Sequence, residues 1–157
     1  MRIKELFNPL PGNRYLEVTT NVDEISFLLA QMMEDVGGKF NISLYESGAP
    51  ATDIRANISH IADKKTLPRV MPREHDMVVL KDIYALHEDK DALLSLSYRT
   101  LANAAHIIIL EKKGVIDTKE LMQRLEEFEF RAANEIDVVD GYDLVMAKKM
   151  HMWGNGL

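Results

Sequence analysis

A chain of 157 residues with 46% hydrophobic residues is long enough to form one domain with a substantial core. Its 25 acidic and 19 basic residues are spread along the sequence and leave a net charge of -6, so free nucleic acid is excluded as an expected partner. The absence of cysteine excludes disulfides, thiolate nucleophiles and zinc ribbons.

The first 13 residues contain two prolines and two asparagines, and we interpret them as a leader arm before a single domain over residues 14–157. Neither this arm nor any later stretch has a signal-peptide pattern or the roughly 20 apolar residues of a membrane span. We therefore expect a cytoplasmic protein that makes no membrane contact.

A strand followed by a helix is the first predicted unit. Residues 15–18 form a short run of β-formers, and apolar residues then recur at the three-four spacing of a helix over residues 25–36. Asp23 and Glu24 place negative charge at the start of this helix, and Gly37 is suited to its end.

The next part of the chain predicts a second strand and a less regular stretch. Residues 40–46 alternate apolar and polar side chains, which indicates a strand that ends at Glu46. Residues 53–65 combine weak helical character with a short strand at 58–62, and both interpretations remain open before a proline-containing loop.

The alternation of strands and helices continues after this loop. The patterns predict a buried strand at 77–83, a helix over 93–101 and a strand at 107–110. A further helix follows with Asp117 or Thr118 as its cap.

Two apolar runs, at residues 136–139 and 144–150, lie on either side of Asp140-Gly141 near the end of the sequence. An Asp-Gly pair in this position predicts a hairpin, so we expect a terminal antiparallel pair. The whole order predicts an α/β fold with a mostly parallel sheet in three layers. Ligands bind such sheets beyond the carboxyl ends of the strands.

Five segments lie at those strand ends or between them. They are Leu16-Glu17-Val18-Thr19-Thr20-Asn21, Glu46, Asp63 before Leu67-Pro68, the stretch from His75-Asp76-Met77-Val78 to Leu86-His87-Glu88-Asp89, and Arg99-Thr100-Leu101-Ala102-Asn103-Ala104-Ala105. In this order they resemble motifs of class I S-adenosylmethionine (SAM) methyltransferases that act on small molecules. The resemblance spans residues 14–150 and implies a Rossmann-like fold with SAM as cofactor. It implies cofactor-binding roles for Glu17, Thr19, Asn21, Glu46 and Asp63.

The first turn departs from the family pattern Leu-Glu-Val-Gly-x-Gly, because Thr19 and Asn21 occupy the two glycine positions. Glycine allows the backbone to approach a cofactor closely, whereas these side chains add bulk. We expect both to project toward the crevice and narrow it. Asp23 and Glu24 would also repel the carboxylate of SAM unless Arg14 or Lys81 offsets their charge.

Each polar candidate also has a structural interpretation. Glu46 could hold the ribose hydroxyls or be a solvated turn acid, and Asp63 could bind adenine or belong to a solvated charge run. His87 could act as a general base near neutral pH, or it could cap the following helix with Asp89 and Asp91. We expect no metal site, because the histidines lack ligand spacing.

Two functions follow from this pattern. The first is a methyltransferase-like domain with weakened or lost SAM chemistry that serves as a binding or assembly module for a small-molecule ligand or a protein partner. The alternative is an active SAM-dependent methyltransferase of a small molecule. The apolar tail around Trp153 either folds onto its own sheet or docks on another subunit of a homo-oligomer, with its own sheet favoured.

Overall fold

The computed structural model describes residues 2–45 and 53–150. The predictions for Glu46 and for the tail around Trp153 fall outside these residues. Among the described residues, no helix is long and apolar enough to cross a membrane.

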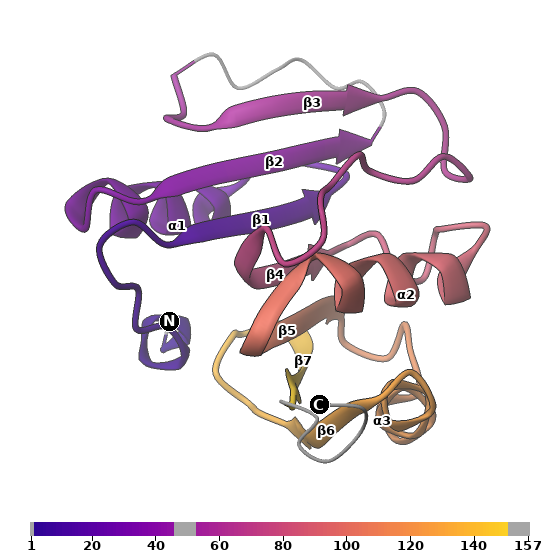
Figure 1. The fold of residues 1–157 in the computed structure, drawn as a ribbon. Helices are drawn as coiled ribbons and strands as arrows, with labels where there is room; N and C mark the ends of the chain where they lie inside the picture. The colour runs from indigo at the N-terminus through magenta and orange to yellow at the C-terminus, as the bar shows by residue number, and fades with distance from the viewer. Residues whose placement is uncertain (1, 46–52, 151–157) are drawn as a thin grey trace, which may run out of the picture.

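The predicted α/β fold is confirmed. Seven strands form one sheet in the order β3-β2-β1-β4-β5-β7-β6 (Figure 1). The pairs among β1 to β5 are parallel, whereas β7 runs antiparallel to both β5 and β6. The elements in chain order are η1 (Ile3–Leu6), β1 (Arg14–Thr19), α1 (Glu24–Asp35), β2 (Lys39–Tyr45), β3 (Asn57–Ile61), β4 (His75–Lys81), α2 (Lys90–Thr100), β5 (Leu101–Lys112), α3 (Thr118–Glu127), β6 (Phe130–Glu135) and β7 (Tyr142–Lys149).

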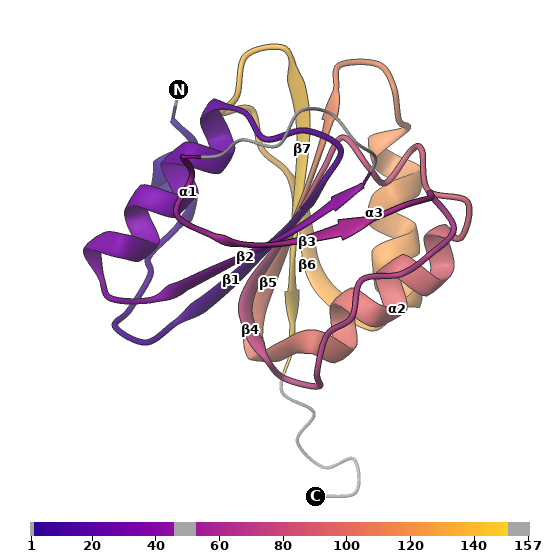
Figure 2. The same cartoon turned by 90° about the horizontal axis from the view of Figure 1, so that it is seen from above.

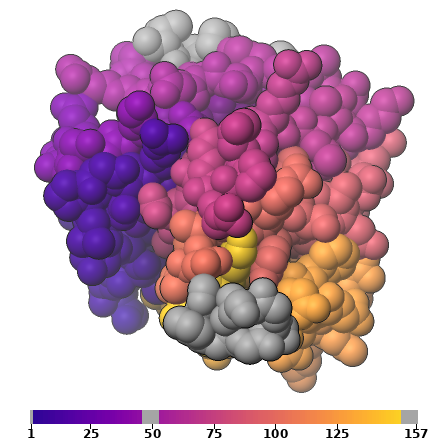
Figure 3. Space-filling model, viewed as in Figure 1, coloured from indigo at the N-terminus to yellow at the C-terminus, as the bar shows by residue number. Residues whose placement is uncertain are grey.

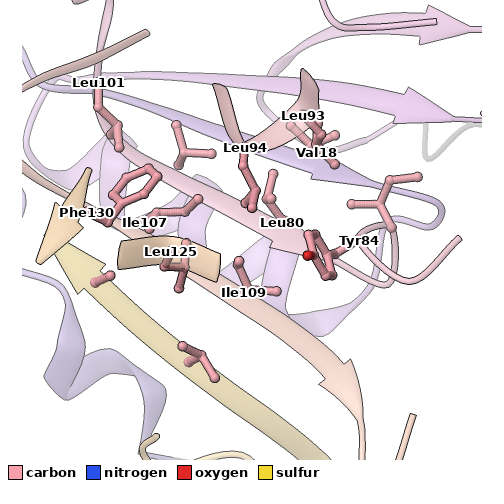
Figure 4. Packing of buried hydrophobic residues seen from close by; sticks show 14 of the residues in the cluster. Val18, Leu80, Tyr84, Leu93, Leu94, Leu101, Ile107, Ile109, Leu125 and Phe130 are labelled. Atoms are coloured by element: carbon pink, nitrogen blue, oxygen red, sulfur yellow. The ribbon is translucent and has the colours of Figure 1, made fainter. Parts of the chain in front are cut away.

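The helices lie on both faces of the sheet, with α1 on one side and α2 and α3 on the other (Figure 2). Leu93 and Leu94 of α2 and Leu125 of α3 pack onto one face, where Leu80 and Ile109 of the sheet meet them (Figure 4). The opposite face is covered by α1 and η1. The neighbouring central strands β1, β4 and β5 are therefore held by packing on both faces of the sheet.

The start of α1 follows its sequence signals closely. Asp23 caps the helix by accepting hydrogen bonds from the backbone N–H groups of Ile25 and Ser26, and Ser26 Oγ accepts from the N–H of Asp23 in return. Gly37, with φ of +67°, follows its carboxyl end. The turn between β1 and α1 is thus held at its helical end.

The terminal antiparallel hairpin is confirmed, but its first strand was misplaced. The strand is β6 at Phe130–Glu135, and the apolar run at residues 136–139 belongs to the connection into β7. Val139 is buried with the α1-side core, which explains its apolar character without strand pairing. Because β6 is an edge strand and only Phe130 is buried in it, its sequence lacks the alternation that would have revealed it.

Two uncertain stretches also take definite structure. The segment interpreted as a leader arm contains η1, and Ile3 is fully buried against the α1-side core. The ambiguous stretch at 53–65 contains the short edge strand β3, so the strand interpretation was the correct one. Residues 62–74, which join β3 to β4, contain no helix.

Candidate functional site

A crevice of about 310 Å³ lies at the carboxyl ends of β1, β4 and β5. This is the edge of the sheet at which the sequence placed the site, as expected for parallel strands. Its lining combines polar, charged and apolar groups: Thr20, Asn21, Asp82, Ala85, Leu86, Glu111, Lys112 and Val115.

In the turn after β1, a side chain of the turn forms hydrogen bonds with the turn's own backbone groups. The hydroxyl of Thr19 donates to the carbonyl of Asn21 at 2.9 Å and accepts from the N–H of Asn21 at 3.2 Å. Asn21 is exposed and lines the crevice, as predicted. The same expectation for Thr19 was wrong, because its side chain is fully buried and folds back onto the turn.

The amino end of α1 leaves few donors for a ligand. A helix that starts at such a turn usually offers its first N–H groups to an anion. Here the side chain of Asp23 accepts from two of them, at Ile25 and Ser26, and the N–H of Asp23 donates to Ser26 Oγ. Together with the N–H of Asn21, four donors around the turn are used within the chain.

The side chain of Lys81, at the end of β4, is fully buried beneath this turn. Its Nζ donates to the carbonyl oxygen of Asn21 at 2.8 Å and lies 2.9 Å from Asp23 Oδ1 and 3.5 Å from Glu17 Oε2. An ammonium has three donors, and three acceptors of this chain surround it. Lys81 is thus the cation that offsets Asp23, one of the two candidates that the sequence offered.

Arg14, the other candidate, cannot fill this role. It begins β1, at the opposite end of the strand from the turn, and its backbone N–H donates to Asp76. The charge at the amino end of α1 is therefore balanced by Lys81.

Glu17 is the second buried member of this cluster. Its Oε2 accepts from Ser26 Oγ at 2.6 Å, and its Oε1 has no hydrogen-bond partner among the described residues. Burial raises the pKa of Glu17 to about 7, although the nearby Lys81 ammonium and the Ser26 hydroxyl act in the opposite direction. The carboxylate and the lysine therefore form one coupled unit within the fold.

This arrangement does not fit the amino-acid end of SAM. That end carries an ammonium, which needs acceptors, and a carboxylate, which needs donors. Oε2 of Glu17 and the carbonyl of Asn21 are directed at Lys81, and the other oxygen of Glu17, Oε1, is fully buried. The four N–H donors described above are bonded internally. A SAM molecule placed against the turn would have to displace the contacts of Lys81.

Two acids of the crevice were not among the predicted site residues. Asp82 follows β4 with φ of +56°, and its Oδ2 accepts from the hydroxyl of Tyr142 at 2.9 Å. Glu111 near the end of β5 is 4% exposed and accepts from the N–H of Ala85. Burial raises the pKa of Glu111 above its usual range. The sequence could have indicated both acids, because each lies at the carboxyl end of a predicted strand, where ligands bind.

Asp63 does not line this crevice. Its Oδ1 accepts from the N–H groups of Lys65 and Thr66 and from the Thr66 hydroxyl, and these bonds lower its pKa. The geometry is that of a turn closed by an aspartate side chain. The position favours the structural interpretation of this residue.

His87 is also placed away from the crevice lining. It is 1% exposed, and its Nδ1 accepts from the N–H of Asp89, which caps α2. Its Nε2 lies 3.3 Å from both the carbonyl oxygen of Thr66 and the hydroxyl of Tyr45. These contacts join the α2 cap to the segment after β3, which favours a positioning role over a general base. The described residues contain no group of three that could hold a metal.

Among comparisons with known proteins, the one with solved structures shows the fold. No family model matches the sequence, and a search of curated proteins found no match. The chain is similar to a SAM-dependent methyltransferase from Aquifex aeolicus, with a TM-score of 0.71, 14% identity, and coverage of 94% of this chain and 88% of the other.

Two further solved structures share the fold. Phosphoethanolamine N-methyltransferase 2 of Haemonchus contortus, in complex with SAM, has a TM-score of 0.73 at 11% identity, covering 96% of this chain and 51% of the other. The methyltransferase complex with the Trm112 activator from Haloferax volcanii has a TM-score of 0.68 at 12% identity, with 92% and 85% covered. The chain spans about half the length of the Haemonchus enzyme. At these identities the comparisons show a class I SAM methyltransferase-like fold.

Proposed function

We propose that this chain, which has the class I SAM methyltransferase-like fold, has weakened or lost its cofactor chemistry and acts as a binding or assembly module. One observation carries the proposal: the buried ammonium of Lys81 lies among the acceptors of the cofactor turn, at Glu17, Asp23 and Asn21. The protein thus supplies from its own chain the cation that a ligand ammonium would provide.

The energetic consequence for SAM binding is large. Breaking a buried ion pair typically costs about 3–5 kcal/mol. A low-micromolar ligand binds with about -8 kcal/mol, and each 1.4 kcal/mol changes affinity about tenfold. Displacing Lys81 would therefore weaken such a ligand by a factor of a hundred or more, to about millimolar affinity.

The remaining crevice supports the module function. Leu86 and Val115 are about half exposed at its lining, and Ala85, which also lines it, donates its N–H to the buried Glu111. A concave site with apolar walls and a few polar groups suits a small-molecule ligand or a short protein segment. If the protein partner is a second copy of this chain, the module forms a homo-oligomer.

An active small-molecule methyltransferase is the second candidate, and the crevice itself favours it. Its volume of about 310 Å³ lies at the lower end of the range for small-molecule sites, about 300–1,000 Å³. In this alternative, Glu17, Thr19, Asn21, Glu46 and Asp63 would hold SAM, and His87 would serve the acceptor. The turn would then have to open before the cofactor binds.

Placing glycine at positions 19 and 21, as in the family pattern, distinguishes the binding module from the active methyltransferase. Thr19→Gly/Asn21→Gly frees the N–H of residue 21 and removes both side chains, so we expect SAM to bind about tenfold more tightly than to the wild type, the gain typical of one or two hydrogen bonds. Equilibrium dialysis with labelled SAM measures the change.

Thr20→Gly is the matched control, because Thr20 lines the crevice and its hydroxyl donates to the carbonyl of Asp82 and not to residue 21. Circular dichroism establishes that each variant is folded. Wild-type SAM affinity that already equals that of the double variant would count against the proposal and in favour of the active enzyme.

A further inference from the structure

A second polar pocket lies on the sheet face that carries α2, away from the carboxyl-end crevice. Its volume is about 190 Å³, and it is lined by side chains of β2 and β3 and by the segment that joins β3 to β4. Figure 3 shows this connecting segment, in magenta, lying across the front of the molecule. Because the segment contains no helix, the pocket is roofed by irregular chain.

Polar side chains of β2 and of the edge strand β3 form the floor of the pocket. Asn41 of β2 pairs with Asn57 of β3, and Ser43 pairs with Ser59, so two amides and two hydroxyls occupy one face. Tyr45, the next residue of β2 on that face, packs with the α2-side core. The polar patch therefore lies between the apolar α2-side core and the exposed edge of the sheet.

A hydrogen-bonded chain holds this floor in place. Asn57 Nδ2 donates to Asn41 Oδ1, and Asn41 Nδ2 lies 3.0 Å from His75 Nε2. An amide nitrogen only donates, so Nε2 accepts and the Nδ1 of His75 carries the proton toward Thr100 Oγ1, 2.9 Å away. The hydroxyl of Thr100 in turn donates to the carbonyl of Met71. The polar wall is preorganised by the fold.

Three groups at the pocket retain hydrogen-bonding capacity. Ser43 is 5% exposed, and its hydroxyl makes no hydrogen bond to another described residue. The guanidinium of Arg69 likewise has no ion pair or hydrogen bond among the described residues. Glu74 uses one carboxylate oxygen to accept from the N–H of Met71. Arg69 and Ser59, which also line the pocket, are exposed, so a ligand can reach them from solvent.

We propose that this pocket binds a small hydroxylated carboxylate. The planar fork of Arg69 suits a carboxylate group. The ligand hydroxyls would meet Ser43, Ser59 and the free oxygen of Glu74, which accepts from a hydroxyl but would repel a bare anion. This inference is independent of the function proposed for the crevice, because the two sites share no lining residue.

Titration with glycerate, followed by amide chemical shifts in two-dimensional NMR, tests the proposal. We expect saturable shifts centred on Ser43, Asn57 and Ser59. Propionate lacks the hydroxyls and glycerol lacks the carboxylate, so each should bind about tenfold more weakly than glycerate.

Arg69→Gln and Ser43→Ala should each weaken glycerate binding, Arg69→Gln by about tenfold. Arg55→Gln is the matched control, since Arg55 is an exposed arginine that pairs with Glu34 outside this pocket. Glycerate shifts that fail to saturate, or that are unchanged in Arg69→Gln, would overturn the proposal. Equal binding of glycerate and propionate would overturn the role of the hydroxyls.

Discussion

Replacing Lys81 with methionine is expected to destabilise the protein by about 3 kcal/mol at pH 7, the lower end of the range for breaking a buried ion pair. Methionine fills a similar volume but leaves the carbonyl of Asn21 and the carboxylate of Asp23 without their cation. The loss stays near the lower end because Glu17, with a pKa of about 7, can take up a proton. Urea unfolding measures the change in free energy of unfolding.

Two further variants show whether the loss comes from the buried cluster. Lys39→Met removes an exposed lysine at the start of β2 and should change stability by less than about 0.5 kcal/mol. Lys81→Met/Glu17→Gln removes both buried charges, so its cost should be smaller than the sum of the two single changes. A Lys81→Met protein as stable as the Lys39→Met control would contradict a structural role for this lysine.

Glu17→Gln is expected to change how stability depends on pH. The pKa of Glu17 rises from its ordinary value of 4.5 to about 7 in the folded protein. Between these values the folded protein keeps a proton that the unfolded chain has released, so this group makes stability fall as pH rises. Over the whole window the wild type should lose about 3 kcal/mol relative to the variant, at about 1.4 kcal/mol per pKa unit.

The difference between the two proteins isolates this residue. Buried His75 also titrates with a lowered pKa, but its contribution is common to both proteins and cancels in the comparison. Urea unfolding at a series of pH values from 4 to 8 gives the two curves. Parallel curves, or a wild type that gains stability relative to the variant as pH rises, would show that Glu17 keeps an ordinary pKa.

Local signals in the sequence were enough to predict the fold. The strand runs, the Asp23 cap and Gly37 mark β1 and α1, and the order of elements leads to the parallel sheet. The exceptions are edge strands. β6 and β3 have few buried side chains, so the alternation that identifies a half-buried strand is missing.

The candidate site was predicted only in outline. Thr19 and Asn21 were both predicted to narrow the crevice, but a side chain that folds back onto its own backbone, as Thr19 does, leaves no pattern in sequence. Lys81 did leave a signal, because it ends the apolar run of β4. The sequence offered Lys81 as one of two cations that could offset Asp23, but its contacts with Asn21 and Glu17, about 60 residues away, left no signal.

We infer that the chain's own side chains close the turn between β1 and α1 to SAM. Calorimetric titration of the wild-type protein with SAM and with S-adenosylhomocysteine tests it most directly. We predict no measurable heat of binding at micromolar concentrations and an affinity of about millimolar or weaker, close to -4 kcal/mol. Binding of either ligand in the low micromolar range, near -8 kcal/mol, would contradict the account and restore the active methyltransferase.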